Sequence, residues 1–155
     1  MAATGPRKYA TWTLALGLLF PVLARPDQAS DLRTILQRIA TGLTDENPAD
    51  ALKPFDRSFS GYNKLSDYFN GLTASYQITN EVNVVDEQDS SDQTTATVDW
   101  TITLGDKTNP GVQDSRYRQI QVRMIREKKH WKIIEFSPID LFDPQFHSRS
   151  GNPPQ

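Results

Sequence analysis

A single acidic side chain lies within the apolar run near the C-terminus of this chain. The segment HWKIIEFS places Glu135 between an isoleucine and a phenylalanine. A carboxyl group that is removed from water has a raised pKa, and it can then transfer a proton to or from a bound ligand. If Glu135 faces the interior, it is therefore the candidate acid or base of an enzyme, acting together with a tyrosine. If it is hydrated or paired with a basic neighbour, it has no such role.

The other residue types limit the kinds of active site that the chain can form. The chain has no cysteine, which excludes a thiolate nucleophile and a thiolate metal site. His130 ends the EKKH turn and His147 lies in the tail, so we expect neither histidine to reach a binding pocket. The sequence contains neither a glycine-rich phosphate loop nor a serine elbow. We therefore predict no metal and no cofactor.

The direction of Glu135 depends on the number of loop residues in the EKKH turn. Residues that lie opposite each other on paired strands share a face of the sheet. An even loop pairs Glu135 with Val122, which belongs to the apolar face of the preceding strand, and it turns Trp131 and Ile133 the same way. An odd loop would reverse every side chain of the last strand. Two-residue turns are common in hairpins, so we favour the even register, with Glu135 inside.

The elements that would position these residues follow from the periodicity. Apolar residues recur at helical spacing over residues 30–43 and 62–76, and Asn47 followed by Pro48 starts a short helix between them. From residue 77 the period becomes two, over 77–86, 94–104, 116–126 and 130–136. Helices followed by strands predict an α+β fold, in which three N-terminal helices pack on a strongly curved antiparallel sheet of four or more strands.

This order of elements, closed by the strand WKIIEFS, resembles the nuclear transport factor 2-like superfamily, also called SnoaL-like or cystatin-like. The resemblance covers roughly residues 29–142. It implies a sheet curved around a long helix into a cone, with a pocket at the open end and the tryptophan of the last strand turned inward. Members of this superfamily include isomerases, dehydratases, cyclases, hydrolases and non-catalytic binding or assembly domains. The resemblance therefore implies a fold and leaves the reaction open.

Enzymes of this superfamily use a histidine–aspartate pair, or an aspartate base with tyrosine donors. The positions of the two histidines argue against the first arrangement. The second stays open, with the candidates Asp56, Asp67, Tyr62, Tyr68, Tyr76 and Tyr117.

The concave face of the predicted sheet supplies the candidate ligand site. If the cone is open, this face would hold an apolar or amphipathic small molecule, and if it is closed the same residues fill the core. We favour an exported, non-catalytic domain that binds a small molecule or another protein, over an isomerase- or hydrolase-like enzyme that uses Glu135. The candidate pocket residues are Phe69, Tyr76, Val98, Trp100, Ile102, Met124, Trp131 and Ile133.

The ends of the chain differ in composition from its middle. Arg7 and Lys8 precede the uncharged stretch TWTLALGLLFPVLA, which is shorter than the roughly 20 residues that span a bilayer. We predict that residues 1–24 are a signal peptide cleaved after Ala24, which leaves no stable membrane anchor. The domain would then be 25–142, secreted or periplasmic, with a flexible tail over 143–155.

The net charge of the chain and the outer face of the sheet indicate which partners to expect. The net charge of −2 gives no reason to expect nucleic acid, and the basic run REKKHWK is interpreted as a solvated hairpin tip. In the even register Ile125, Ile134 and Phe136 form an apolar strip on the outer face. Such a strip is typical of an interface. It predicts a homodimer as a further alternative.

Overall fold

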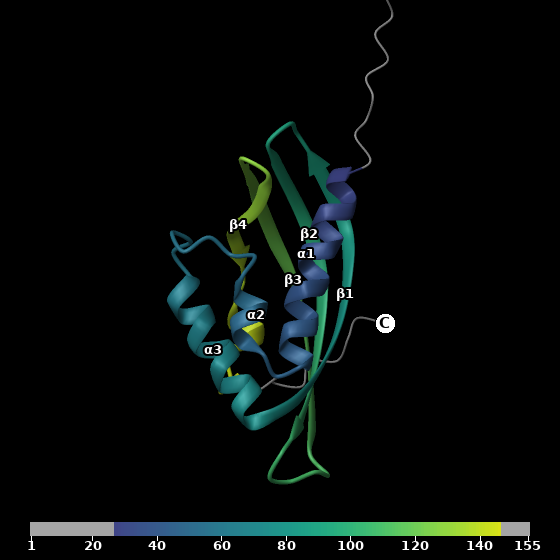
Figure 1. The fold of residues 1–155 in the computed structure, drawn as a ribbon. Helices are drawn as coiled ribbons and strands as arrows, with labels where there is room; N and C mark the ends of the chain where they lie inside the picture. Colours follow the sequence, from purple (N-terminus) through teal and green to yellow (C-terminus); the bar gives the residue numbers. More distant parts are fainter. Residues whose placement is uncertain (1–26, 147–155) are drawn as a thin grey trace, which may run out of the picture.

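Three helices precede one four-stranded sheet in this chain (Figure 1). The computed structural model describes residues 27–146, with side chains from Ser30 onward. The predicted signal peptide and most of the predicted tail lie outside these residues, so cleavage and export stay predictions. The elements are α1 Asp27–Thr44, α2 Pro48–Leu52, α3 Tyr62–Ser75, β1 Tyr76–Asp89, β2 Gln93–Asp106, β3 Gln113–Glu127, β4 His130–Ser137 and the short 3-10 helix η1 Asp140–Phe142.

The helices form where local signals in the sequence predict them. The Asn47 side chain accepts a hydrogen bond of 3.1 Å from the Asp50 backbone N–H, and Pro48 takes the first helical position, where an N–H has no partner. α1 begins at Asp27, upstream of Ser30. Within residues 27–146, no helix is both long and apolar enough to cross a membrane. The buried apolar stripes of α1 and α3 are Leu32, Leu36, Ile39, Leu43, Leu65, Phe69 and Leu72.

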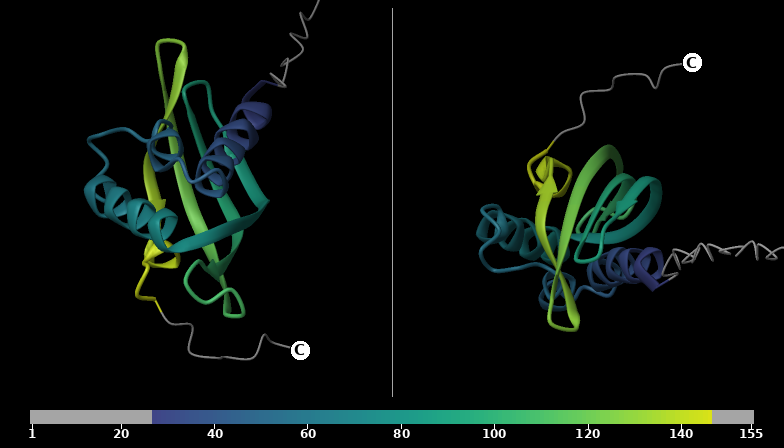
Figure 2. Two further views of the ribbon diagram at one scale, coloured as in Figure 1. Left: turned by 60° about the horizontal axis from the view of Figure 1, so that its bottom comes forward. Right: turned by 90° about the horizontal axis from the view of Figure 1, so that it is seen from above.

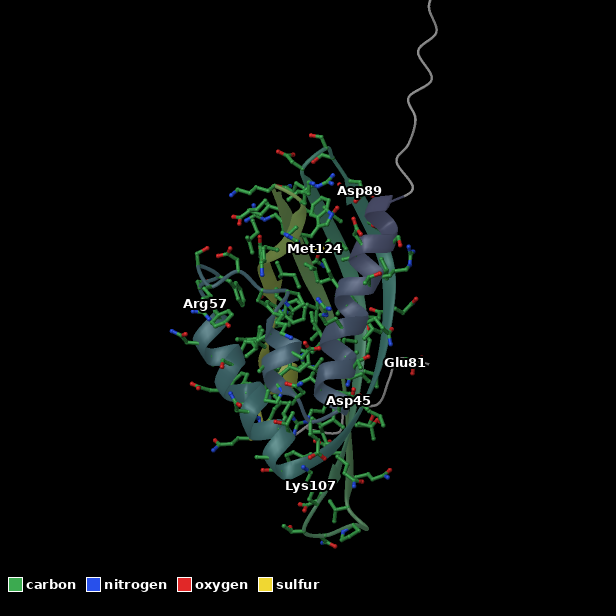
Figure 3. The ribbon with its side chains drawn as sticks, viewed as in Figure 1. Asp45, Arg57, Glu81, Asp89, Lys107 and Met124 are labelled. Atoms are coloured by element: carbon green, nitrogen blue, oxygen red, sulfur yellow. The ribbon has the colours of Figure 1, made fainter. Side chains whose placement is uncertain are left out.

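The sheet is an antiparallel meander in the order β1-β2-β3-β4, which confirms the predicted α+β class. It curls and stays open, and the helices lie on its concave side (Figure 2). The alternation read from the sequence is accurate for β2, where buried and half-buried residues follow one another along the strand. β2 and β3 pair without interruption, so their apolar residues meet on the concave face. Met124 is one of them, and its side chain lies between the sheet and the helices (Figure 3).

The β3–β4 turn has the even loop that was predicted. Glu127 pairs with His130, so Lys128 and Lys129 alone form the loop, and Lys128 has a φ of 57°. The pairing continues as expected as far as Ile133, which lies opposite Met124. Trp131 and Ile133 are therefore buried, as the even register requires.

A β-bulge then reverses the second half of β4. Ile134 has no partner on β3, and the next pairs are Glu135 with Arg123 and Phe136 with Val122. Glu135 is consequently exposed on the outer face, and Phe136 is buried. The prediction that Glu135 faces the interior is wrong, because one extra residue in a strand moves all later side chains to the opposite face.

The edge of β4 is paired where the bulge begins. The backbone N–H of Ile133 donates to the carbonyl of Pro54 at 2.9 Å, and its own carbonyl accepts from the N–H of Asp56 at 2.9 Å. Phe55 forms a parallel bridge with Ile133 between these two bonds. The segment that leaves α2 therefore covers the edge of the sheet and places the α2–α3 connection beside β4.

The chain folds back after β4 and closes the core. Leu141 and Phe142 of η1 are buried, and the Phe142 ring lies 5.2 Å from Phe69 and 5.5 Å from Trp100, centroid to centroid. The following residues also contact the domain, since the Tyr68 hydroxyl donates to the Asp143 carboxylate at 3.0 Å. The folded part thus includes residues 143–146, which had been assigned to the tail.

Candidate functional site

An open cavity lies between α1, the end of α2 and the β3–β4 hairpin, and we name it the basic cleft. Its volume is about 570 Å³. This lies within the usual range of small-molecule sites, about 300–1,000 Å³. Its lining residues are Asp31, Thr34, Ile35, Arg38, Lys53, Pro54, Glu127, Lys128, Lys129, His130, Trp131 and Lys132.

Two side chains of β4 join the walls of the basic cleft. The Trp131 indole N–H donates to the Asp31 carboxylate at 2.9 Å, which ties the hairpin to α1. The Lys132 ammonium donates to the backbone carbonyl of Lys53 at 2.8 Å, which ties the same strand to the end of α2. Neighbouring residues on a strand point to opposite faces, so Trp131 contacts α1 from the concave face, whereas Lys132 starts on the other face of this edge strand and reaches the Lys53 carbonyl.

Positive charge exceeds negative charge around this cavity. Asp31, one of its acids, is already occupied by the Trp131 indole. Lys53 forms an ion pair of 2.6 Å with Asp50, and this hydrogen bond holds the pKa of Asp50 below its usual value. Lys128 and Lys129 are exposed at the hairpin tip, where they form no ion pair with any residue in 30–146. The arrangement can accept an anionic group beside an indole.

Comparison with known proteins identifies the fold. No known protein family matches the sequence, and no curated protein matches it. Solved structures do match. A conserved protein from Planctomyces limnophilus has a TM-score of 0.67 at 8% identity, over 72% of this chain and 94% of that one. A Nostoc punctiforme protein of unknown function with a cystatin-like fold has a TM-score of 0.57 at 13% identity, over 72% and 90%.

A third solved structure carries the family designation. It is a putative dehydratase from the nuclear transport factor 2-like family of Streptomyces avermitilis, with a TM-score of 0.60 at 11% identity, over 72% of this chain and 95% of that one. The chain has the nuclear transport factor 2-like fold. At these identities the likeness concerns the fold alone, and this fold serves many unrelated functions.

The interior of this nuclear transport factor 2-like cone is packed with side chains. Tyr76 and Trp131, two of the predicted pocket residues, lie at its margin, half-buried and 9% exposed. The other predicted pocket residues have no exposed surface, so they line no open cavity and fill the core, which is the alternative that the sequence left open. These are Phe69, Val98, Trp100, Ile102, Met124 and Ile133, each 0% exposed.

The candidate catalytic residue lies outside this interior. The Glu135 carboxylate accepts a hydrogen bond of 2.8 Å from Arg123, and both side chains are about half exposed, at 52% and 41%. This is the hydrated and paired arrangement, the alternative to a desolvated acid in the interior. His130 is exposed at the start of β4 but lines the basic cleft, contrary to the expectation that it would reach no pocket.

The aspartates and tyrosines do not converge on the interior either. Asp56 accepts from the backbone and hydroxyl of Ser58, which lowers its pKa. The Tyr117 hydroxyl donates to Asp99 on the outer face at 2.8 Å. Among residues 30–146 the only charged side chain that is buried is Arg116. No group of three or more potential metal ligands occurs in the part of the chain that the structure describes.

The basic cleft was not predicted from the sequence. Its signal was the basic run REKKHWK, which had been interpreted as a solvated turn. The run alone does not reveal a cavity, because Arg38 and Lys53 come from other elements.

One carboxylate on β1 has a buried oxygen atom that forms no hydrogen bond within residues 30–146. The Glu87 Oε1 atom is buried and is the one such side-chain atom within residues 30–146 that lacks a hydrogen bond. Burial, and then repulsion by Asp89, raise the pKa of Glu87, while Arg33 acts in the opposite direction. The charged form of Glu87 is therefore disfavoured in the folded state.

We expect Glu87→Gln to stabilise the fold at neutral pH by less than about 1 kcal/mol, since part of the side chain is solvated. A carboxyl whose pKa is raised on folding costs stability as the pH rises from its ordinary value of 4.5 through the raised value. The gain should thus be present at pH 7 and absent near pH 4. Thermal unfolding at both pH values measures it, and Glu81→Gln is the matched control on the same strand. An equal gain at both pH values would contradict the assignment.

Proposed function

We propose that this chain is a non-catalytic binding domain whose binding site is the basic cleft, and that the cleft takes an anionic partner. One observation carries the proposal: the cone interior is filled, whereas an open cavity of about 570 Å³ beside it is lined by cationic side chains and an indole. Secretion through the predicted signal peptide is part of the same proposal.

The lining of the cleft supports an amphipathic anion. Trp131, Ile35 and Pro54 provide its apolar surface. Lys128 and Lys129 are exposed at the hairpin tip and can move toward a ligand, because neither is held by an ion pair to any residue within 30–146. An anion bound there replaces its hydrogen bonds to water with charge-assisted hydrogen bonds to these lysines. Its apolar part covers the edge of the Trp131 indole.

The two alternatives from the sequence have less support. The hypothesis of an acid–base enzyme has less support, because its candidate acid or base, Glu135, is on the outer face and not in the cone interior. The homodimer has less support, because Phe136 is buried and does not belong to the outer face. Ile125 and Ile134 remain of the predicted apolar strip, and both are half-buried among polar neighbours. The homodimer stays a prediction.

We expect 2-naphthoate, a small aromatic carboxylate, to bind the cleft weakly, and Lys129→Glu to weaken this binding about fivefold to tenfold. The substitution replaces an attractive charge on the rim with a repulsive one. The indole N–H signal of Trp131 reports binding by NMR, because that group lies in the cleft.

Lys64→Glu is the matched control, since it makes the same change of net charge on α3, where Lys64 contacts Tyr68. Neutral 2-naphthol should bind more weakly than the carboxylate. Equal effects of the two charge reversals, or no shift of the Trp131 signal, would refute the proposal.

A further inference from the structure

Two further cavities adjoin the basic cleft. One of about 650 Å³ shares Lys53 and Lys132 with it and continues to Arg57 and Tyr62 at the start of α3. Another of about 490 Å³ shares Thr34 and Arg38 with it and continues along α1. The three cavities are neighbours across α1, α2 and β4, because each of the two shares lining residues with the basic cleft, and we name them together the long groove.

The charges along the long groove are mainly positive. Three of its acids are bound by neighbours, whereas Glu127 lies on the rim: Asp31 accepts from the Trp131 indole, Asp50 is paired with a lysine, and Asp56 accepts from Ser58. Arg57 lies on the α2–α3 connection, away from the hairpin (Figure 3), and forms no ion pair within residues 30–146. The cations that line the first two cavities are Arg38, Lys53, Arg57, Lys128, Lys129 and Lys132.

Apolar surface recurs between these charges. The basic cleft contains Trp131 and Pro54, and the cavity beyond Lys132 contains Phe55 and Tyr62. A compact ligand would fill only one of these places. An extended chain could place an apolar side chain on the indole and direct acidic side chains to cations on both sides of Lys132.

We propose that the long groove binds an extended acidic peptide segment of a partner protein, with an apolar residue seated against Trp131. This rests on the proposed function, because the basic cleft is its central part. A protein segment fits better than nucleic acid. The chain as a whole has a net charge of −2, and Glu127 and Asp56 lie on the rim, so a uniform polyanion would meet repulsion that spaced carboxylates avoid.

The test compares an acetylated, amidated peptide with 2-naphthoate on the purified protein. The peptide has about seven residues, with Phe at its centre, Asp or Glu spaced on both sides of it and Ser elsewhere, and spans roughly 23 Å when extended. Because it occupies linked subsites, we expect it to bind at least about 30-fold more tightly than 2-naphthoate, with an affinity that falls as salt rises. Arg57→Gln should weaken the peptide about threefold or more, and should affect 2-naphthoate less. Lys64→Gln is the matched control and should change neither.

The remaining outcomes overturn the inference. If 2-naphthoate binds as expected while the peptide binds no more tightly and is insensitive to Arg57→Gln, the long groove is not a peptide site, although the proposed function stands. If neither probe binds, both fail. If a single-stranded oligodeoxynucleotide binds as tightly as the peptide, or if a peptide with Asn and Gln in place of its acids does, the assigned partner chemistry is wrong.

Discussion

Replacing Phe136 by alanine is expected to destabilise the domain by about 3–5 kcal/mol. The ring is 1% exposed and lies 5.2 Å from Phe55, 6.0 Å from Trp100 and 5.9 Å from Phe142, centroid to centroid. Its loss would leave a cavity between the curled sheet, η1 and the α2–α3 connection. Urea-induced unfolding measures the effect, and Phe136→Leu, which keeps most of the volume, provides a value if the alanine variant is too unstable to purify.

Glu135→Ala is the matched control for this prediction. Its carboxylate pairs with Arg123 on the outer face, where both side chains are about half exposed, and such pairs contribute no more than about 1 kcal/mol. In a strand without the bulge at Ile134 the two residues would exchange faces. A large loss for Glu135→Ala with a small one for Phe136→Ala would therefore disprove the β4 register.

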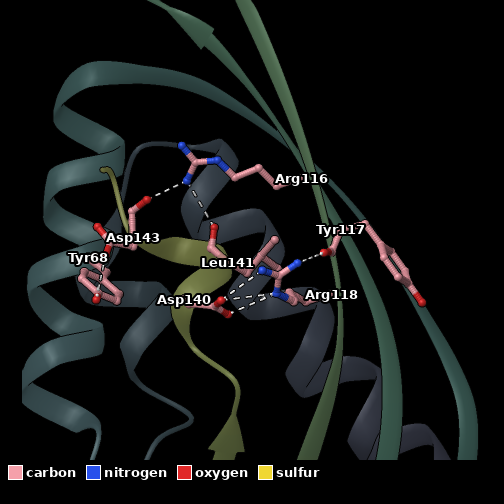
Figure 4. Close-up of polar contacts among 7 residues, drawn as sticks. All are labelled: Tyr68, Arg116, Tyr117, Arg118, Asp140, Leu141 and Asp143. Carbon is pink, nitrogen blue, oxygen red and sulfur yellow. Dashed lines mark hydrogen bonds and ion pairs between the residues drawn. The ribbon is translucent and has the colours of Figure 1, made fainter. Parts of the chain in front are cut away.

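Replacing Arg116 by methionine is expected to cost about 2–4 kcal/mol, because methionine keeps the apolar stem and removes every donor. The Arg116 guanidinium is buried. It donates to the Asp114 carboxylate at 2.7 Å. It also donates to the carbonyls of Asp143 at 2.6 Å and Leu141 at 3.4 Å (Figure 4). Without it, the carbonyls that end η1 lose a buried donor. Urea-induced unfolding gives the loss, and hydrogen exchange over residues 139–146 shows whether the segment opens.

Arg118→Met is the companion variant. Arg118 is two residues along β3 and pairs with Asp140 at 3.1 Å, but the two side chains are 37% and 44% exposed. Solvent screens such a pair, so we expect a loss within about 1 kcal/mol, with some further loss from its contact with the Phe146 ring. Similar losses for the two variants would show that burial of Arg116 does not hold the C-terminal segment.

The hairpin shows how far sequence reasoning extends along one strand. The two-residue loop of EKKH determined the pairing of the first residues of β4, and Trp131 and Ile133 face inward as predicted. Beyond Ile133 both faces of the strand are apolar, so the period of two contains no information about direction. The bulge at Ile134 coincides with the point where residues 54–56 bond to the edge of β4, and no local pattern predicts a contact between segments so distant in the chain.

The candidate site was harder to predict from the sequence than the fold was. The lysines of REKKHWK are visible in the sequence, but the cavity that they line also needs Arg38 of α1 and Lys53 after α2. Whether the cone would be open was equally unknown. Phe142 occupies its interior only because the chain turns back after β4, and the arginines that hold this turn are spaced along β3.

The sequence by itself determined the order of helices and strands, the helix starts near α2 and the inner faces of β2 and β3. These depend on local periodicity and capping, which act over a few residues. Only the tertiary structure decided that Phe136 and not Glu135 enters the core, that the core fills the cone, and that cations from separate elements surround Trp131. Each of these depends on contacts between distant segments, where the burial of aromatic rings outweighs the preferences of a single strand.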